Sequence, residues 1–209
     1  HYKLYVIYQY WIIHIRRKNF PPYAQFGSRY GLMRFSEKTL SSKTVYDGKI
    51  FEVCTQKVLL DDNSTAVRDV VIHHGGAGVL ATDSDNRVFL VRQYRKGAEC
   101  EMLEIPAGKL EKGEDPKACA VRELREEIGA EADSIEFLGS FFPTPAYCSE
   151  KIHIYFAAGL HLKEQHLDKG EFLEIVKVPF KDAVNMVMSG EITDAKTIIA
   201  LLKANEMLK

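Results

Sequence analysis

The sequence predicts an α/β protein in which a mixed β-sheet lies between helices on its two faces, an α/β/α sandwich. Three observations lead to this prediction. Short segments of alternating apolar and polar residues, separated by turn signals, recur between residues 44 and 178. One amphipathic helix is predicted among them, over 116–128, and two more follow the last strand. Strands and helices mixed in this order indicate a sheet that is covered on both sides.

Composition and charge agree with one soluble globular domain. The chain has 209 residues, 46% of them hydrophobic and 27% charged, which suffices for a well-buried core. A formal net charge of -1 gives no indication of a surface for nucleic acid. The four cysteines are scattered without a C-x-x-C pair, so we expect a reducing cytoplasm and neither disulfides nor a zinc site.

Residues 1–32 look foreign to the rest of the chain. The stretch 4–15 is aromatic and apolar, but a dozen residues is too short for a helix that spans a membrane. Three interpretations stay open: an N-terminal extension that is not native to the fold, a membrane-surface segment, or an extra strand. We favour the first. The remaining chain divides into an antiparallel β region over 33–75, expected to serve dimerisation, and a main domain over 76–209.

The strands are predicted from alternation and from the turns between them. In the first region they cover 44–46, 49–60 and 66–74, with turns at Asp47-Gly48 and at 61–64. In the main domain they cover 76–82, 87–94, 102–105, 135–142, 151–158 and 172–178. The two closing helices are predicted over 181–188 and after Asp194, which is suited to cap the second of them.

The central helix has clear end signals. Glu114 or Asp115 can cap it, Pro116 suits its first turn, and Gly129 suits its end. Spacings of three and four predict one apolar stripe, made of Ala118, Val121, Leu124 and Ile128. Three glutamates are predicted on the opposite side: Glu123, Glu126 and Glu127.

These glutamates oppose the electrostatics of the helix that carries them. Acidic side chains near the C-terminal end of a helix each cost roughly 0.3–1 kcal/mol. Arg122, four residues before Glu126, offsets only part of this. A solvated acidic face is one interpretation; a bound divalent cation, which prefers carboxylate oxygens, is the other. The glycine-rich loop before the helix and the register of Glu114 with Arg122 favour the cation.

The spacing of these residues resembles the Nudix box throughout. The matching positions are Gly108, Glu114, Arg122-Glu123-Leu124, Glu126-Glu127 and Gly129; Ala130 departs from the pattern, where a larger aliphatic residue is usual. The resemblance implies a hydrolase with the Nudix α/β/α sandwich. Such enzymes split a nucleoside diphosphate linked to another moiety, using Mg²⁺ or Mn²⁺.

The same resemblance implies roles for particular residues. Glu123 and Glu127 would be direct metal ligands, together with the backbone carbonyl of Ala107, and Glu126 would assist. Glu114 would pair with Arg122 and orient the cluster. The general base would lie outside the box, on the loop before the last strand, where Glu171 is the first candidate and Glu174 the second.

Further stretches resemble the ADP-ribose pyrophosphatase subgroup. They are Pro145, LVRQYR at 90–95, EIPAGKLE at 104–111 and Ser149-Glu150; Ala146 departs, since many members have glycine there. In this subgroup the N-terminal antiparallel sheet is exchanged between the subunits of a homodimer. The alternative is a hairpin folded on its own domain.

The resemblance also suggests residues that bind the substrate. Arg68 and Arg95 are predicted near its adenine and phosphates, because arginine stacks on planar bases and forks onto phosphate oxygens. Either could instead be an ordinary surface residue. Glu150 is predicted at the terminal ribose, with a salt bridge at the dimer contact as the alternative.

The leading functional hypothesis is a Mg²⁺-dependent hydrolase that converts ADP-ribose to AMP and ribose 5-phosphate. One alternative is the same chemistry on another nucleoside diphosphate sugar, such as GDP-mannose. A more remote one is a non-catalytic module that senses ADP-ribose, which the presence of all three box glutamates disfavours. We expect a cytoplasmic homodimer that acts on a small molecule and binds neither nucleic acid nor membranes.

Overall fold

A computed structural model describes residues 35–167 and 169–208. The extension predicted over 1–32 lies outside these residues. Contacts divide the described chain into two units. We call 74–143 with 151–208 the sandwich unit, and 35–73 with 144–150 the three-stranded unit.

The sandwich unit contains a seven-stranded mixed sheet. Its main strand order is β10-β5-β4-β9-β8, while β6 pairs with β5 and β7 with β4. The pairing of β4 with β9 is parallel and the others are antiparallel. The strands are β4 (Gly76–Thr82), β5 (Arg87–Arg95), β6 (Cys100–Glu104), β7 (Ala107–Lys109), β8 (Ala130–Phe141), β9 (Ile152–Leu162) and β10 (Leu173–Pro179).

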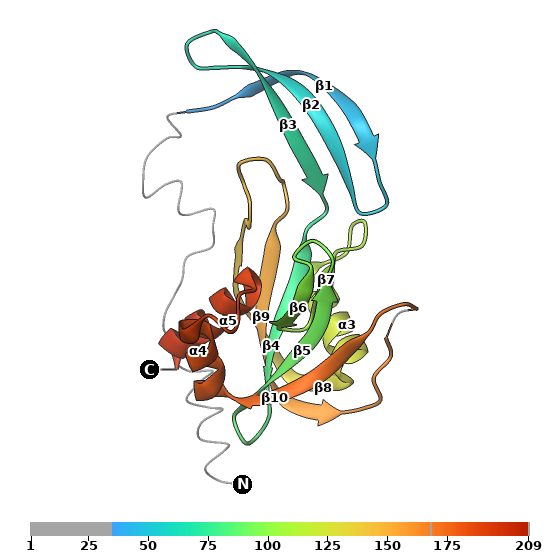
Figure 1. Ribbon diagram of the computed structural model, residues 1–209, viewed down its shortest axis with the longest axis vertical. Helices are drawn as coiled ribbons and strands as arrows, with labels where there is room; N and C mark the ends of the chain where they lie inside the picture. Colours follow the sequence, from blue (N-terminus) through green and yellow to red (C-terminus); the bar gives the residue numbers. More distant parts are fainter. Residues whose placement is uncertain (1–34, 168, 209) are drawn as a thin grey trace. The chain divides into compact units, whose positions relative to one another are not determined.

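Helices cover both faces of this sheet. The helix α3 (Pro116–Ile128) contacts β4, β7 and β8, whereas α5 (Ala195–Met207) contacts β9 and β4. The third described helix, α4 (Phe180–Ser189), lies beside α5 and contacts β10 and β5. In Figure 1, α3 lies on one side of the strands of this unit and α4 with α5 on the other. The predicted α/β sandwich with a mixed sheet is therefore confirmed.

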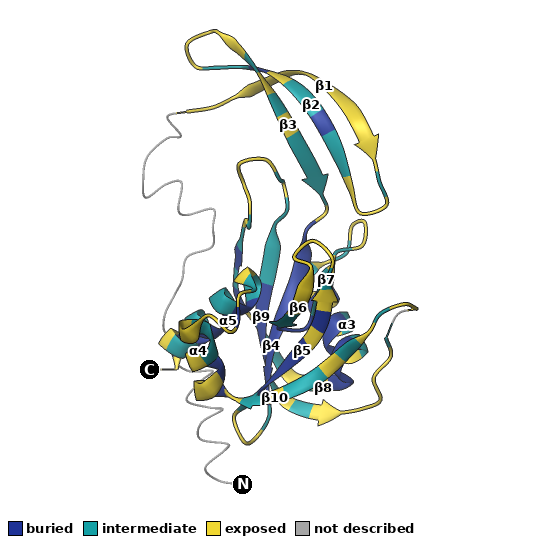
Figure 2. Ribbon diagram, in the orientation of Figure 1, coloured by how far each residue is buried: buried dark blue, intermediate teal, exposed yellow. Residues whose placement is uncertain are grey.

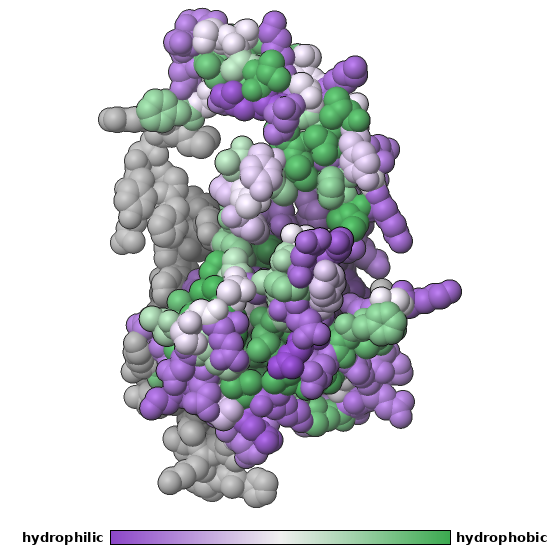
Figure 3. Space-filling model, in the orientation of Figure 1, coloured by the Kyte–Doolittle hydropathy of each residue, from purple (hydrophilic) through white to green (hydrophobic). Residues whose placement is uncertain are grey.

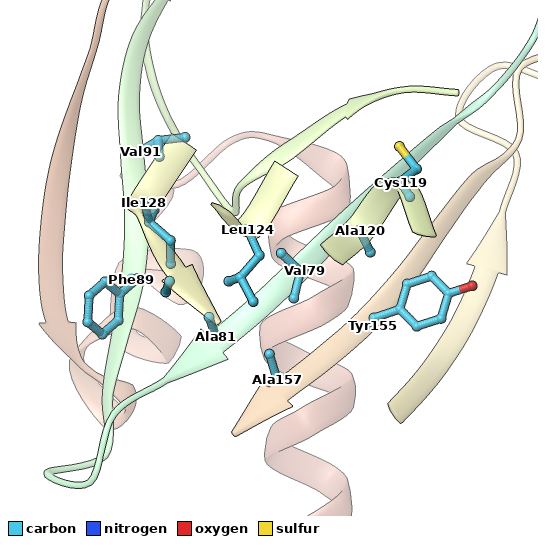
Figure 4. Packing of buried hydrophobic residues seen from close by; sticks show 12 residues of the cluster. Val79, Ala81, Phe89, Val91, Cys119, Ala120, Leu124, Ile128, Tyr155 and Ala157 are labelled. Atoms are coloured by element: carbon cyan, nitrogen blue, oxygen red, sulfur yellow. The ribbon is translucent and has the colours of Figure 1, made fainter. Parts of the chain in front are cut away.

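The core of the sandwich unit is built on β4. Every residue of this strand is buried, which fits a strand with helices on both faces (Figure 2). Leu124 and Ile128 of α3 pack against apolar side chains of β4 and β5, among them Val79 and Phe89 (Figure 4). The packing fixes α3 to the sheet, and with it the glutamates that α3 carries.

The three-stranded unit is an antiparallel sheet in the order β1-β2-β3. Its strands are β1 (Lys38–Asp47), β2 (Phe51–Leu59) and β3 (Thr65–His73). The loop 144–150 belongs to the same unit, since the Val71 N–H donates to the Tyr147 carbonyl at 2.7 Å. Hydrophobic and hydrophilic side chains both show on the face of this sheet in Figure 3. Exchange of the sheet between subunits stays a prediction.

The structure departs from the predicted strands in several places, among them the end of β9, which lies at Leu162 and not at residue 158. β1 begins at Lys38 and not at Thr44, and β8 begins at Ala130 and not at Ile135. The short strand β7 was not expected, because a three-residue segment after proline carries too little alternation to be recognised. β7 nevertheless matters, since it brings the residues before α3 against β4.

Candidate active site

The ends of α3 are those that the sequence predicts. Asp115 caps the helix and its carboxylate accepts hydrogen bonds from the N–H groups of Lys117 and Ala118. Gly129 ends it in the left-handed conformation, at φ 59°. A Cβ at this position would also lie 2.6 Å from the Lys163 carbonyl oxygen, so glycine lets the following loop approach.

The predicted faces of α3 need correction. Leu124 and Ile128 are buried as expected, but Val121 is 45% exposed. Glu123 and Glu127, expected on the side opposite the apolar stripe, are buried with 8% and 2% exposed. The reason is that α3 is covered along a second edge, where β7 contacts it. Helical periodicity alone does not reveal such a neighbour. The remaining differences are that Ala118 is exposed and that Cys119 and Ala120 are buried.

Glu127 is the most deeply buried glutamate of this helix. Its Oε2 accepts a hydrogen bond from the Ala107 N–H at 2.8 Å, a donor without net charge. Burial raises its pKa, the Ala107 N–H opposes the rise, and the charges of Glu123 and Glu171 add to it, so that the pKa reaches about 8. The charge of Arg95 compensates this carboxylate only in part.

Glu123 lies one turn before Glu127, against β7. A Cβ added to Gly108 would lie 1.7 Å from Glu123 Oε1, so only glycine permits this approach. Burial raises the pKa of Glu123, although Arg122 opposes the rise. The charges of Glu126 and Glu171 raise it further.

Arg122 connects the acidic residues of the cluster. Its Nε donates to Glu114 Oε1 at 3.0 Å, which gives the pair that the resemblance implies. Its Nη1 donates to Glu123 Oε1 at 2.6 Å and to Glu126 Oε2 at 3.0 Å. One guanidinium therefore faces three carboxylates, and Glu127 receives no hydrogen bond from it. The cluster keeps an excess of negative charge.

Glu171 belongs to the same electrostatic environment, since its charge raises the pKa of both Glu123 and Glu127. The loop before it is fastened to the end of α3. Gln165 Nε2 donates to the Glu127 carbonyl at 2.5 Å, and the His166 N–H donates to the Glu126 carbonyl at 3.1 Å. Nothing in the sequence pattern predicted this anchoring. The role of Glu171 as a base stays a prediction.

Arg95 also lies in the sandwich unit. Its Nε and Nη2 donate to the two oxygens of Glu104, at 2.6 and 2.7 Å. Lys196 Nζ donates to the same carboxylate. It also donates to Asp194 Oδ1 at 3.0 Å. The pKa of Arg95 is raised, mainly by its hydrogen bonds to Glu104. The negative charge of Glu127 adds a smaller contribution. The side chain of Arg95 is 43% exposed.

The other two predicted substrate residues lie in the three-stranded unit. Arg68 forms a bidentate ion pair with Glu37, at 2.6 and 3.0 Å. Glu150 Oε1 lies 3.7 Å from His73 Nδ1. Binding of substrate by Arg68 and Glu150 stays a prediction.

The donor set fits a hard divalent cation. In the described part of the chain, no three His, Cys, Asp or Glu side chains form a group able to hold a metal. The predicted set has only two such side chains, Glu123 and Glu127, with the Ala107 carbonyl as third donor. These are oxygen donors, as Mg²⁺ and Mn²⁺ prefer. A cation would neutralise the charge that Glu123 and Glu127 carry when they are ionised.

Comparison with known proteins agrees with this geometry. The model of the NUDIX domain matches residues 72–201. A methanol dehydrogenase activator from Bacillus methanolicus is 40% identical over 179 residues, which are 84% of this chain and 97% of that protein. An ADP-ribose pyrophosphatase from Bacillus subtilis is 37% identical over 167 residues, or 79% and 90% of the two chains. The chain belongs to the Nudix family.

A solved structure agrees with the fold. The crystal structure of an ADP compounds hydrolase superposes with a TM-score of 0.73 at 25% identity and covers 83% of this chain and 94% of that one. Within the described residues, no helix is long and apolar enough to cross a membrane.

Sequence reasoning missed the cluster around Glu104. It joins residues that are 9 and 92 positions apart in the chain, namely Arg95, Glu104 and Lys196. No local spacing encodes such contacts. The one available signal was a glutamate directly before a buried isoleucine and a proline, which predicts a strand end and not an ion pair.

Proposed function

We propose that this Nudix pyrophosphatase hydrolyses ADP-ribose to AMP and ribose 5-phosphate in a Mg²⁺-dependent reaction, with Mn²⁺ as a substitute. The observation that supports this best is the pair of buried glutamates, Glu123 and Glu127, with Glu171 close enough to raise the pKa of both. The relative named ADP-ribose pyrophosphatase supports the choice of substrate.

The chain's own residues would divide the work as follows. Glu123, Glu127 and the Ala107 carbonyl would hold the cation, and Arg122 would keep Glu123 and Glu126 in place. When bound, the cation would neutralise the charge of phosphate oxygens and lower the pKa of a water molecule. Glu171 would take the proton of the attacking water on its carboxylate.

Recognition of the substrate would come from three further residues. Arg95 is partly exposed and is held in orientation by Glu104, so its free edge can meet a phosphate oxygen. Arg68 would stack on the adenine and Glu150 would bind the terminal ribose. We infer further that the enzyme is a cytoplasmic homodimer in which β1, β2 and β3 are exchanged between subunits.

The test is a panel of nucleoside diphosphate sugars, assayed by product release with Mg²⁺, with Mn²⁺ and with EDTA. We expect ADP-ribose to be cleaved with a higher kcat/KM than GDP-mannose, and EDTA to abolish cleavage. A strong preference for GDP-mannose would assign the chain to the alternative substrate. Undiminished turnover by Glu127→Gln would contradict the catalytic role of Glu127. Binding of ADP-ribose without turnover by the unmodified chain would support a sensing module.

A second candidate function comes from the relative named methanol dehydrogenase activator, which this chain matches over 97% of that protein's length. The chain would then raise the activity of a methanol dehydrogenase. A coupled assay with the dehydrogenase of Bacillus methanolicus tests this. Faster methanol oxidation with the unmodified chain, and not with Glu127→Gln, would support an activation that depends on hydrolysis.

A further inference from the structure

The segment 104–107, which runs from the last residue of β6 to the first residue of β7, is held from one side by the first turn of α5. Lys196 binds the Glu104 carboxylate, and the side chains of Lys196 and Glu104 are only 11% and 1% exposed. The Ile105 N–H donates to Thr197 Oγ1 at 2.8 Å, and both residues are fully buried. A buried N–H without this acceptor would lose its hydrogen bond altogether.

The other half of the segment leads to the glutamate cluster. The Pro106 carbonyl accepts a hydrogen bond from the Val79 N–H of β4 at 2.9 Å. The Ala107 N–H donates to Glu127 Oε2 at 2.8 Å. Residues 104–107 therefore form a continuous connection from α5 to Glu127.

The hydroxyl of Thr197 is itself fixed in direction. It donates to Asp194 Oδ2 at 2.6 Å while it accepts from Ile105. Asp194 caps α5, because the same Oδ2 also accepts from the Thr197 N–H at 2.9 Å. The hydroxyl thus uses its single hydrogen as donor and one lone pair as acceptor, with no freedom to turn away from the segment.

We propose that Thr197 and Lys196 are positioning residues of the cation site: they fix segment 104–107, and through it the Ala107 backbone and the Glu127 carboxylate. This inference rests on the proposed function only in taking Glu127 and the Ala107 carbonyl as cation ligands. Groups that orient metal ligands contribute strongly to affinity, and their loss lowers metal affinity or activity about 10–100-fold.

The experiment measures Mn²⁺ binding by the decrease of the free-ion EPR signal, on the full chain and its variants. Thr197→Val removes the acceptor for the Ile105 N–H, and Thr197→Ser retains it. We expect the Kd for Mn²⁺ to rise about tenfold in Thr197→Val and to stay within about twofold in Thr197→Ser. If Thr197→Val does not fold, Thr197→Cys has similar size with a weak acceptor and the same expected rise.

A control separates positioning from general loss of stability. Ala204→Gly weakens the same helix at a fully buried position outside the contacts described above. It should lower Tm and leave the Kd for Mn²⁺ unchanged. Hydrolysis of ADP-ribose gives a second readout: in Thr197→Val the half-saturating Mn²⁺ concentration should rise while the KM for ADP-ribose at saturating Mn²⁺ does not.

The outcomes are distinguishable. Unchanged Mn²⁺ affinity in Thr197→Val, or an equal loss in Ala204→Gly, overturns the positioning role. If the unmodified chain binds Mn²⁺ but does not cleave ADP-ribose, the proposed function fails while the EPR comparison still decides this inference. If the unmodified chain binds no Mn²⁺, both fail.

Discussion

Glu104 and Glu127 are both almost completely buried, with 1% and 2% exposed, yet their pKa values move in opposite directions. Burial alone would raise the pKa of Glu104, but Arg95 and Lys196 outweigh it and hold the pKa below its ordinary value. Glu127 has one neutral N–H donor and acidic neighbours, and its pKa rises to about 8. Positively charged side chains of the protein therefore compensate the charge of Glu104, whereas Glu127, among the described residues, has no hydrogen bond from such a side chain. A bound cation could supply the missing positive charge.

This contrast separates an ion cluster that is compensated within the chain from the cluster that is proposed to bind a cation. Buried charges that are paired hold a fold in one arrangement but change little when a ligand binds. A buried acid without a partner is instead poised to respond to a cation. The two lie at opposite ends of the segment 104–107, so the compensated cluster can support the uncompensated one.

The largest expected effect is on turnover. Glu127→Gln removes a proposed cation ligand while it keeps the size of the side chain and the acceptor for the Ala107 N–H. We expect kcat/KM for ADP-ribose to fall about a thousandfold or more, since metal stabilisation of the transition state contributes several kcal/mol. The measurement is steady-state hydrolysis at saturating Mg²⁺. A decrease in kcat/KM of less than tenfold would show that Glu127 is not a ligand of the catalytic cation.

The next largest effect is on stability. Glu104→Gln leaves Arg95 and Lys196 without their shared carboxylate. Loss of one partner of a buried ion pair destabilises a protein by about 3–5 kcal/mol, and we expect the lower end because Arg95 is partly exposed. Urea unfolding measures this. Lys96→Gln is the control, because the ion pair of Lys96 with Glu99 is exposed. An equal loss of stability in the two variants would show that the buried cluster stabilises the fold no more than an exposed ion pair does.

The pH dependence of stability should differ between the two clusters. The pKa of Glu127 is raised from 4.5 in the unfolded chain to about 8. Its contribution to the free energy of unfolding is therefore complete below pH 4.5 and is lost as pH rises to about 8. The free energy of unfolding then falls by at most about 1.4 kcal/mol per pH unit. The contribution of Glu104, whose pKa is lowered, is present above pH 4.5 and is lost at lower pH.

Urea unfolding of the metal-free protein between pH 5 and 8 tests this sign. The free energy of unfolding should fall with rising pH, and Glu127→Gln should flatten the curve. A curve of unchanged slope in that variant would show that Glu127 is not the residue responsible.

The smallest expected effect concerns the approach of β7 to α3. Gly108→Ala would place a methyl group against the Glu123 carboxylate, which must move. We expect Mn²⁺ affinity to fall about tenfold, as for other losses of ligand orientation, with little change in Tm. Gly97→Ala is the matched control, because a Cβ there meets no atom within 4 Å.

Local patterns predicted the ends of α3 and the register of its glutamates. Asp115, Pro116 and Gly129 each act on neighbouring backbone groups, so their effect is visible in the sequence. Burial of Glu123 was not predictable in this way, because it depends on contact with a strand of three residues. The partners of Glu104 were equally hidden, since Lys196 is 92 residues away.

The most direct test of the central claim is calorimetric titration of Mg²⁺ into the unmodified chain and into Glu127→Gln at pH 7, in buffers of different ionisation enthalpy. Because Glu127 has a pKa of about 8 without metal, binding should release about one proton per chain, and the variant should bind far more weakly with little release. Equal affinity and equal proton release in the two proteins would contradict the account.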